Sequence, residues 1–124
     1  MGAYNDVFVK KVFSAQSVSA SGIEWSEALD LGSINQDGLF SLQLLVTGDG
    51  TLQVEYELSH DGVNFVTPTT ALDIVSAFTK TSGPGSDGKD IYSFDPELGR
   101  FMKIKVTETG GANAAVITAH LASQ

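Results

Sequence analysis

The sequence predicts an all-β protein, an antiparallel β-sandwich or jelly roll of about seven or eight strands. Two observations predict this class. Apolar side chains alternate with polar ones in several runs, which is the period of a strand with one buried face. Gly, Asp and Asn gather between those runs, where tight turns need a positive φ. Short strands with almost no helix favour two packed sheets.

The first element expected is the segment from Tyr4 to Phe13, YNDVFVKKVF. Val7 and Val9 face one way and Phe8 faces the other, as in a strand. Two interpretations remain open. The segment is either the first core strand, or an arm that pairs with a neighbouring subunit or docks on a larger surface, because unpaired β edges are templates for such pairing.

Two short strands are expected next, at Ile23–Trp25 and Ala28–Leu31. The run from Leu39 to Thr47 then predicts a longer strand with one apolar face, formed by Phe40, Leu42, Leu44 and Val46. Gly48-Asp49-Gly50 turns the chain into the run Leu52–Leu58, whose inner face is Leu52, Val54, Tyr56 and Leu58. Its other face, with Gln53, Glu55 and Glu57, is expected to meet water.

A hairpin is predicted after this strand. The turn is Ser59-His60-Asp61-Gly62, and Val63, Asn64 and Phe65 are expected to return beside it. Asp-Gly between apolar runs is a strong short-range hairpin signal. Ala71–Phe78 fits either a strand or a short helical turn, and Thr81–Lys89 is expected to be an exposed loop.

The last two elements are clear strands. Met102, Ile104 and Val106 alternate with Lys103, Lys105 and Thr107, so Lys103 and Lys105 are expected to face acidic neighbours such as Glu55 and Glu57. Gly110–Asn113 turns the chain into Ala115–Ala122. Arg100, the only arginine, is expected to anchor a strand end. The chain divides into residues 1–13, a strand or arm, and residues 14–124, a single sandwich domain.

Composition and charge exclude several classes of function. The 7 basic and 15 acidic residues give a formal net charge of −8, which disfavours nucleic acid and anionic membrane surfaces as partners. There is no cysteine, so disulfides, zinc–thiolate sites and cysteine nucleophiles are absent. No apolar run approaches the roughly 20 residues of a membrane span. The first six residues, MGAYND, show no basic region followed by an apolar stretch, so we expect no secretory signal.

The sequence offers no set of catalytic residues. The two histidines, His60 and His120, have no His or Cys at metal-ligand spacing, and no GxSxG elbow is present. Asp-Gly pairs recur at turns, where they are ordinary turn chemistry and not a dense calcium loop. We therefore expect no enzyme activity, no cofactor and no metal.

Two candidate surfaces remain. Apolar residues on faces assigned to solvent or in the N-terminal segment indicate a contact with another subunit or a shell; they are Val7, Phe8, Val9, Phe13, Leu45 and Phe101. The alternative is a sugar-binding surface around an exposed aromatic residue and the hairpin turn, formed by Trp25, His60, Asp61 and Asn64 together with the Gly83–Lys89 loop.

The run Tyr56–Phe65, YELSHDGVNF, resembles the Y-x-x-S-x-D-G-x-x-aromatic hairpin of discoidin-like, galactose-binding jelly rolls. Gly99–Ile104 is similar to the Arg-aromatic strand that follows in those domains, and the resemblance covers roughly residues 30 to 108. It implies a jelly roll. The family's sugar- or lipid-binding loops have no recognisable counterpart here, and its frequent disulfide is absent.

The whole chain is similar in type to small structural proteins of tailed bacteriophages, in particular head decoration (cement) proteins. It is short, acidic, cysteine-free, and rich in glycine and threonine. This resemblance implies a homo-oligomer, often a trimer, on the outer surface of the virion, made in the host cytoplasm without a signal peptide. Its partners would be copies of itself and the major capsid protein or another virion component. The alternative is a carbohydrate-binding module or a tail or fibre adhesin domain.

Overall fold

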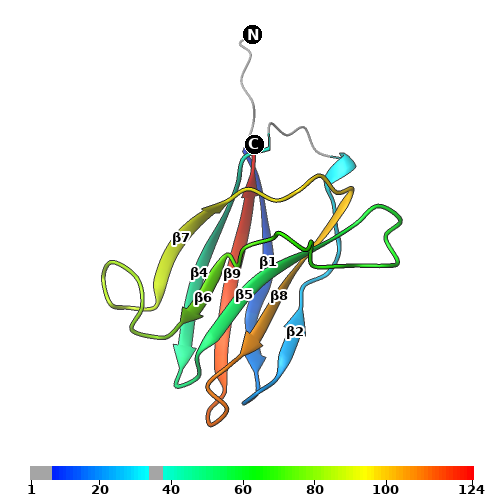
Figure 1. Cartoon of the computed structure of the whole chain (residues 1–124). Helices are drawn as coiled ribbons and strands as arrows, with labels where there is room; N and C mark the ends of the chain where they lie inside the picture. The colour runs from blue at the N-terminus through cyan, green and yellow to red at the C-terminus, as the bar shows by residue number, and fades with distance from the viewer. Residues whose placement is uncertain (1–6, 34–37) are drawn as a thin grey trace.

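The protein is a β-sandwich of two antiparallel sheets, described by a computed structural model over residues 7–33 and 38–124 (Figure 1). These described residues form nine strands and one short 3₁₀ helix, at Leu31–Ser33. The strands are β1 (Phe8–Val18), β2 (Ile23–Trp25), β3 (Leu29–Asp30), β4 (Phe40–Gly48), β5 (Leu52–Ser59), β6 (Val75–Phe78), β7 (Lys89–Phe94), β8 (Phe101–Glu108) and β9 (Ala115–Ser123). The predicted fold class is confirmed, with more strands than the seven or eight expected.

The strands divide into sheet A, with the order β1-β9-β4-β7, and sheet B, with the order β2-β8-β5-β6 and the short β3 beside β8. All strand pairs are antiparallel. The turn at Gly48–Gly50 carries the chain from sheet A to sheet B, so β4 and β5 are consecutive in sequence but not paired. The first and last strands, β1 and β9, are neighbours in sheet A.

The core lies between the inner faces of the two sheets. The alternation predicted for the four long strands is confirmed, because every predicted inward side chain is buried. These are Phe40, Leu42, Leu44 and Val46 of β4, Leu52, Val54, Tyr56 and Leu58 of β5, Met102, Ile104 and Val106 of β8, and Ile117, Ala119 and Leu121 of β9. Burial of each large side chain is worth about 1.5–3 kcal/mol before entropy is counted.

The hairpin predicted after β5 forms only as far as its turn, and the prediction of a returning strand at residues 63–65 is wrong. Leu58 and Val66 form one isolated bridge, and residues 63–65 form no strand. The carboxylate of Asp61 accepts the backbone N–H groups of Val63 and Asn64, both at 2.9 Å, so these groups do not pair with β5. The ladder partner of β5 on that side is β6 instead.

Two further elements complete the sheets. The ambiguous segment 71–78 is a strand over Val75–Phe78, and Phe78 is fully buried. The exposed loop predicted before Lys89 is confirmed, and it is followed by β7, an edge strand that the sequence analysis did not identify. β7 pairs with β4 from Phe40–Phe94 to Leu45–Lys89.

The N-terminal segment is a strand of sheet A from Phe8 onward, and its residues 1–6 lie outside the described residues. The register against β9 shifts between Lys11 and Phe13, and again before Gln16. A bulge of this kind places two residues opposite one and turns the following side chain to the other face. Phe13 therefore points inward and is buried.

The buried carboxylate of Glu108 connects three turns at one end of the sandwich by hydrogen bonds. Glu108 is 2% exposed and accepts four backbone N–H groups, from Ser21 at 3.0 Å, Thr51 at 2.9 Å, and Gly110 and Gly111 at 2.8 Å each. These donors stabilise the charged form and hold the pKa of Glu108 at about 2, against the opposing effect of burial.

Candidate functional site

The outward side chains of β1, β9, β4 and β7, together with Val7 and Leu39 at the ends of the strands, form a surface that we call the A face. Its composition follows from the register of sheet A. One row across the four strands is Val9, Ala122, Ser41 and Ser93, and the next is Lys11, His120, Gln43 and Ile91. Directly opposed residues point to the same side of a sheet, so both rows lie on the face away from the core.

The A face carries a concentration of exposed apolar side chains. Eleven large apolar side chains are exposed among the described residues, and five of them lie here: Val7, Val9, Leu39, Leu45 and Ile91. Isolated exposed apolar residues are normal, whereas several on one sheet face are typical of a contact surface.

The A face is also free of carboxylates along its strands. β1, β4 and β9 contain no Asp or Glu, and the only acidic residue of β7, Asp90, stands opposite the buried Leu44 on the inner side. The outward charged residues are Lys11 on β1 and Lys89 on β7, at the two edges of the sheet. In a chain of net charge −8, this face is neutral at its centre, with a lysine at each edge and the exposed carboxylate of Asp95 just beyond the end of β7.

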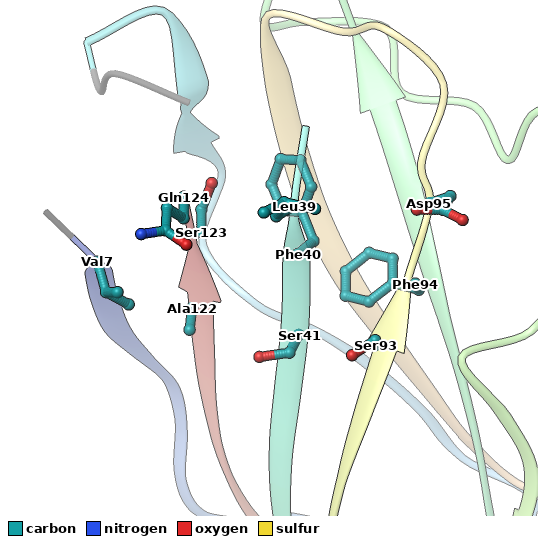
Figure 2. Close-up of a pocket in the computed structure, with 10 residues that line it drawn as sticks. All are labelled: Val7, Leu39, Phe40, Ser41, Ser93, Phe94, Asp95, Ala122, Ser123 and Gln124. Atoms are coloured by element: carbon teal, nitrogen blue, oxygen red, sulfur yellow. The ribbon is translucent and has the colours of Figure 1, made fainter. Parts of the chain in front are cut away.

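Two hollows lie on the A face. The larger, of about 350 Å³, crosses the strand ends, where Val7 precedes β1 and Ala122, Ser41 and Ser93 come from β9, β4 and β7 (Figure 2). The carboxylate of Asp95, just after β7, also lines it. The second, of about 240 Å³, is lined by Leu45, Lys89, Thr118 and His120 among others. The face therefore has the relief needed to receive the side chains of a partner.

The structure brings together three of the six predicted contact residues. Val7, Val9 and Leu45 are exposed on the A face. Phe8 is half-buried opposite Ser123. The remaining two are corrected below.

Phe13 belongs to the core, because the bulge in β1 turns it inward. Phe101 is half-buried on sheet B, on the other side of the molecule, where the Arg100 guanidinium lies 5.4 Å from its ring centre. Phe13 and Phe101 are therefore not part of the same surface as Val7, Val9 and Leu45.

Only some of the residues of the predicted sugar surface lie close together in the structure. His60, Asp61 and Asn64 line a hollow of about 340 Å³ with Pro68, Glu97 and others, and none of its lining residues is Phe, Tyr or Trp. The Asp61 carboxylate is already used by its own turn: it accepts hydrogen bonds from Ser59 Oγ at 2.8 Å and from Asn64 Nδ2 at 2.9 Å. The backbone N–H groups of Asn64 and Val63, and after them these two side-chain hydrogen bonds, hold the pKa of Asp61 well below its usual range.

Trp25 lies apart from this hollow. It pairs with Lys105 on β8, whereas Ser59, at the rim of the hollow, pairs with Phe101. Four residues along a strand separate the two positions by about 13 Å. The Gly83–Lys89 loop is on the opposite side of the molecule from the loop that follows β5 (Figure 1). The predicted sugar platform is thus not assembled as a unit.

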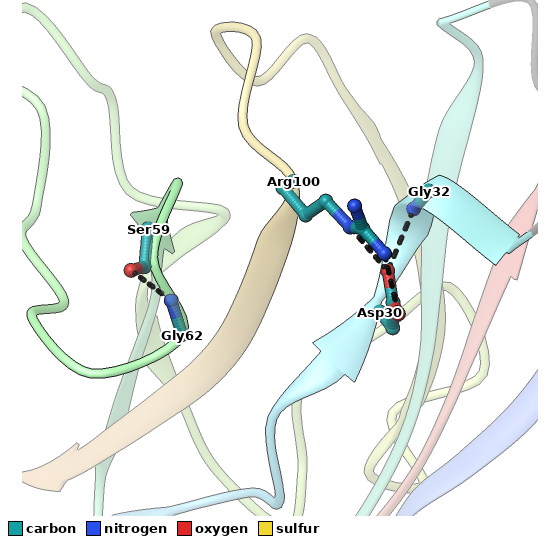
Figure 3. A network of polar contacts seen from close by, with 5 residues as sticks. All are labelled: Asp30, Gly32, Ser59, Gly62 and Arg100. Atoms are coloured by element: carbon teal, nitrogen blue, oxygen red, sulfur yellow. Dashed lines mark hydrogen bonds and ion pairs between the residues drawn. The ribbon is translucent and has the colours of Figure 1, made fainter.

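Arg100 anchors a strand end, as predicted. Its Nε donates to Asp30 Oδ1 at 3.0 Å and its Nη2 to Oδ2 at 3.2 Å, while the Gly32 N–H also donates to Asp30 Oδ1, at 3.0 Å (Figure 3). These contacts lower the pKa of Asp30, with the Arg100 hydrogen bond as the main cause. The pair fixes β3 and the following 3₁₀ turn beside β8.

The described part of the chain shows no cluster of three or more His, Asp or Glu residues able to hold a metal ion. None of its helices is long and apolar enough to span a bilayer.

Two residues of the A face, Leu39 and Ile91, were not singled out from the sequence. Ile91 lies in the unassigned strand β7. Its alternation with Tyr92 and Phe94 in KDIYSF was the available signal.

No protein-family model matches the chain, and no curated protein matches it. Among solved structures, the chain is similar to a chain in the structure of infectious bursal disease virus Gx strain, with a TM-score of 0.48 and 9% identity over 95% of this chain. It spans about a third of that chain's length, 32%. It is also similar to CpGH89CBM32-6 produced by Clostridium perfringens, with a TM-score of 0.36 and 15% identity over 94% of both chains.

Proposed function

We propose that the chain is a non-enzymatic structural protein of a bacteriophage particle, a capsid decoration protein that binds the outside of the assembled shell. The observation that carries the proposal is the A face. It is an open sheet face with exposed Val7, Val9, Leu39, Leu45 and Ile91, and its strands expose no carboxylate. Such a face suits a protein that works by contact with other proteins.

The mechanism is stabilisation by mass action. A ligand that binds the assembled state and not the free subunits shifts the equilibrium towards assembly. The sandwich is suited to this task because its core and its Glu108-bonded turns hold the A face rigidly, so little ordering entropy is lost on contact. β1 is the strand through which the N-terminal segment, with the exposed Val7 and Val9, joins this face.

Binding to particles tests the proposal. Phage particles stripped of this protein would be incubated with the purified chain, pelleted and assayed for bound protein. We expect saturable binding and a higher temperature of particle disruption. Ile91→Glu, on the A face, should reduce binding, whereas the control Ile23→Glu, on sheet B, should not. Absence of binding, or equal loss in both variants, would contradict the proposal.

A carbohydrate-binding role is the second candidate, favoured by the hollow that brings His60, Asp61 and Asn64 together. Asn64 Nδ2 already donates a hydrogen bond to Asp61 Oδ2. The amide oxygen of Asn64 and the His60 ring are therefore the groups that a sugar hydroxyl would meet. A glycan array tests this role. Binding that is lost in Asn64→Ala and retained in Trp25→Ala would support it, and an array without signal would dismiss it.

A further inference from the structure

We infer that the larger hollow of the A face receives a basic side chain of the shell subunit, a lysine or an arginine, whose charged group lies at Asp95. The inference rests on the proposed function, which gives this face to the shell, and it adds the chemistry of the group that the shell supplies. Three observations carry it: the shape of the hollow, a carboxylate without a partner, and the hydroxyl groups beside it.

The hollow is a trough that follows a row of small side chains. Ala122, Ser41 and Ser93 are directly opposed across β9, β4 and β7, so their side chains lie on one line across the sheet. Larger side chains bound this line at the strand ends (Figure 2); they are Val7, Gln124, Leu39 and Asp95. The volume of about 350 Å³ is sufficient for one long side chain of a partner.

The carboxylate of Asp95 is exposed at the β7 end of the trough. It makes no hydrogen bond or ion pair with any other residue that the structure describes, whereas Asp30 and Glu108 are bonded within the chain. A shell subunit that covers the A face removes water from this carboxylate. Covering an ionised group without a partner is unfavourable, so the group placed over Asp95 must donate hydrogen bonds and is best a cation.

The other charges of the A face leave room for a cation at this position. Lys11 lies on β1, three strands from β7, at a distance of about 14 Å, and Lys89 lies six residues back along β7, about 20 Å away. Both distances exceed the Debye length of about 8 Å at physiological salt. An acidic side chain would be repelled by Asp95, and a purely apolar one would leave the carboxylate unpaired.

Hydroxyl groups supply the further acceptors that an ammonium or guanidinium group needs. Ser41 and Ser93 line the trough, and so does Ser123, which is 2% exposed. The Ser123 Oγ is buried and has no hydrogen-bond partner among the described residues. A buried hydroxyl without a partner is unfavourable, and a donor that enters the hollow would satisfy it. A basic side chain combines such donors with an apolar stem that can lie against Val7 and Ala122.

Binding of the full chain to stripped particles, measured by pelleting over a range of protein concentrations, tests the inference. Asp95→Asn should raise the dissociation constant about tenfold, and Asp95→Lys should raise it further. Glu57→Gln is the matched control, because it makes the same change in net charge on sheet B, opposite Lys103, and should bind as wild type does. Since Asp95 has no partner among the described residues, thermal unfolding of Asp95→Asn should match that of wild type.

Salt and volume give two further readouts. The ratio of the dissociation constants of Asp95→Asn and wild type should fall as NaCl is raised from about 0.05 to 0.5 M, because salt screens the attraction that the variant lacks. Ser93→Leu fills the trough without changing the charge. It should weaken binding by a factor that does not depend on salt.

Equal dissociation constants for wild type and Asp95→Asn would overturn the inference, as would an equal loss in Glu57→Gln, which would make net charge the cause. Either result, with wild-type binding intact, leaves the decoration role in place. A wild-type chain that binds no particle would instead contradict the proposed function itself, and the inference with it.

Discussion

The Nζ of Lys103 lies 4.3 Å from the centre of the Phe65 ring, although Glu57 stands directly opposite Lys103 in the ladder between β5 and β8. Lys105 likewise lies 5.9 Å from the Trp25 ring, with Glu55 opposite. The ion pairs expected from the sequence are thus replaced, among the described residues, by cation–aromatic contacts. An ammonium is attracted to the face of an aromatic ring, and the loop after β5 brings Phe65 onto sheet B.

A double-mutant cycle between Lys103→Met and Phe65→Leu should therefore give a coupling of about 0.5–1 kcal/mol in the free energy of unfolding. Both substitutions keep apolar bulk and remove the charge or the ring. The measurement is urea denaturation at pH 7. A parallel cycle between Lys103→Met and Glu57→Gln is the control, and a larger coupling there would show that the acidic partner dominates after all.

Glu108 makes stability depend on pH. Its pKa in the folded protein is about 2, below the ordinary value of 4.5, because four backbone N–H groups bind the charged form. A lowered pKa contributes stability above about pH 4.5 that is lost as the pH falls towards 2. Glu108→Gln should be less stable than wild type at pH 7, and its unfolding temperature should fall less between pH 5 and pH 2.

Thermal unfolding followed by circular dichroism from pH 2 to pH 7 measures this effect. Glu55→Gln, on the outer face of β5, is the control and should follow the wild-type curve. Parallel pH curves for wild type and Glu108→Gln would show that the buried carboxylate is not the group responsible.

Phe78 tests the assignment of β6. It is fully buried and packs edge-on against Tyr92, with ring centres 6.1 Å apart. Phe78→Ala should lower the free energy of unfolding by about 3–5 kcal/mol, since it leaves a cavity in the core. Leu72→Ala, at a position 83% exposed just before the strand, should change it by less than about 0.5 kcal/mol. Chemical denaturation of both variants measures this difference. Small and similar decreases in the free energy of unfolding of the two variants would place residues 71–78 outside the core.

Asp61 determines the path of the chain after β5. Asp61→Ala removes the acceptor of the Val63 and Asn64 amides, so hydrogen exchange at these two amides should accelerate by about tenfold or more. Leu58 and Val66 bond to each other, at 2.8 and 3.0 Å, and their amides should be little affected. Unchanged exchange at Val63 and Asn64, measured by NMR, would mean that these groups have another partner.

The sequence predicted those elements whose pattern depends only on alternation. β4, β5, β8 and β9 are long, and each keeps one apolar face against the core, so period two identifies them and their inward residues. The same alternation would have located Glu108, which continues the inward series of Met102, Ile104 and Val106. A buried carboxylate there was not expected, because its partners come from turns distant in sequence.

The errors arose where long-range pairing overrides local pattern. The bulge in β1 turns Phe13 into the core, and no local signal marks the position of a bulge. The Asp-Gly turn after β5 forms, yet the side chain of Asp61 takes the amides that a returning strand would need. The A face was only partly predicted, since it needs the order of four strands and one of them, β7, was not recognised.

The most direct test of the proposed role is the protein composition of purified phage particles, measured by quantitative mass spectrometry. The account predicts that the chain is present at a fixed ratio to the shell subunits and is released with the outer layer under conditions that leave the shell intact. Its absence from particles, with the chain recovered only in the soluble fraction of infected cells, would contradict the account.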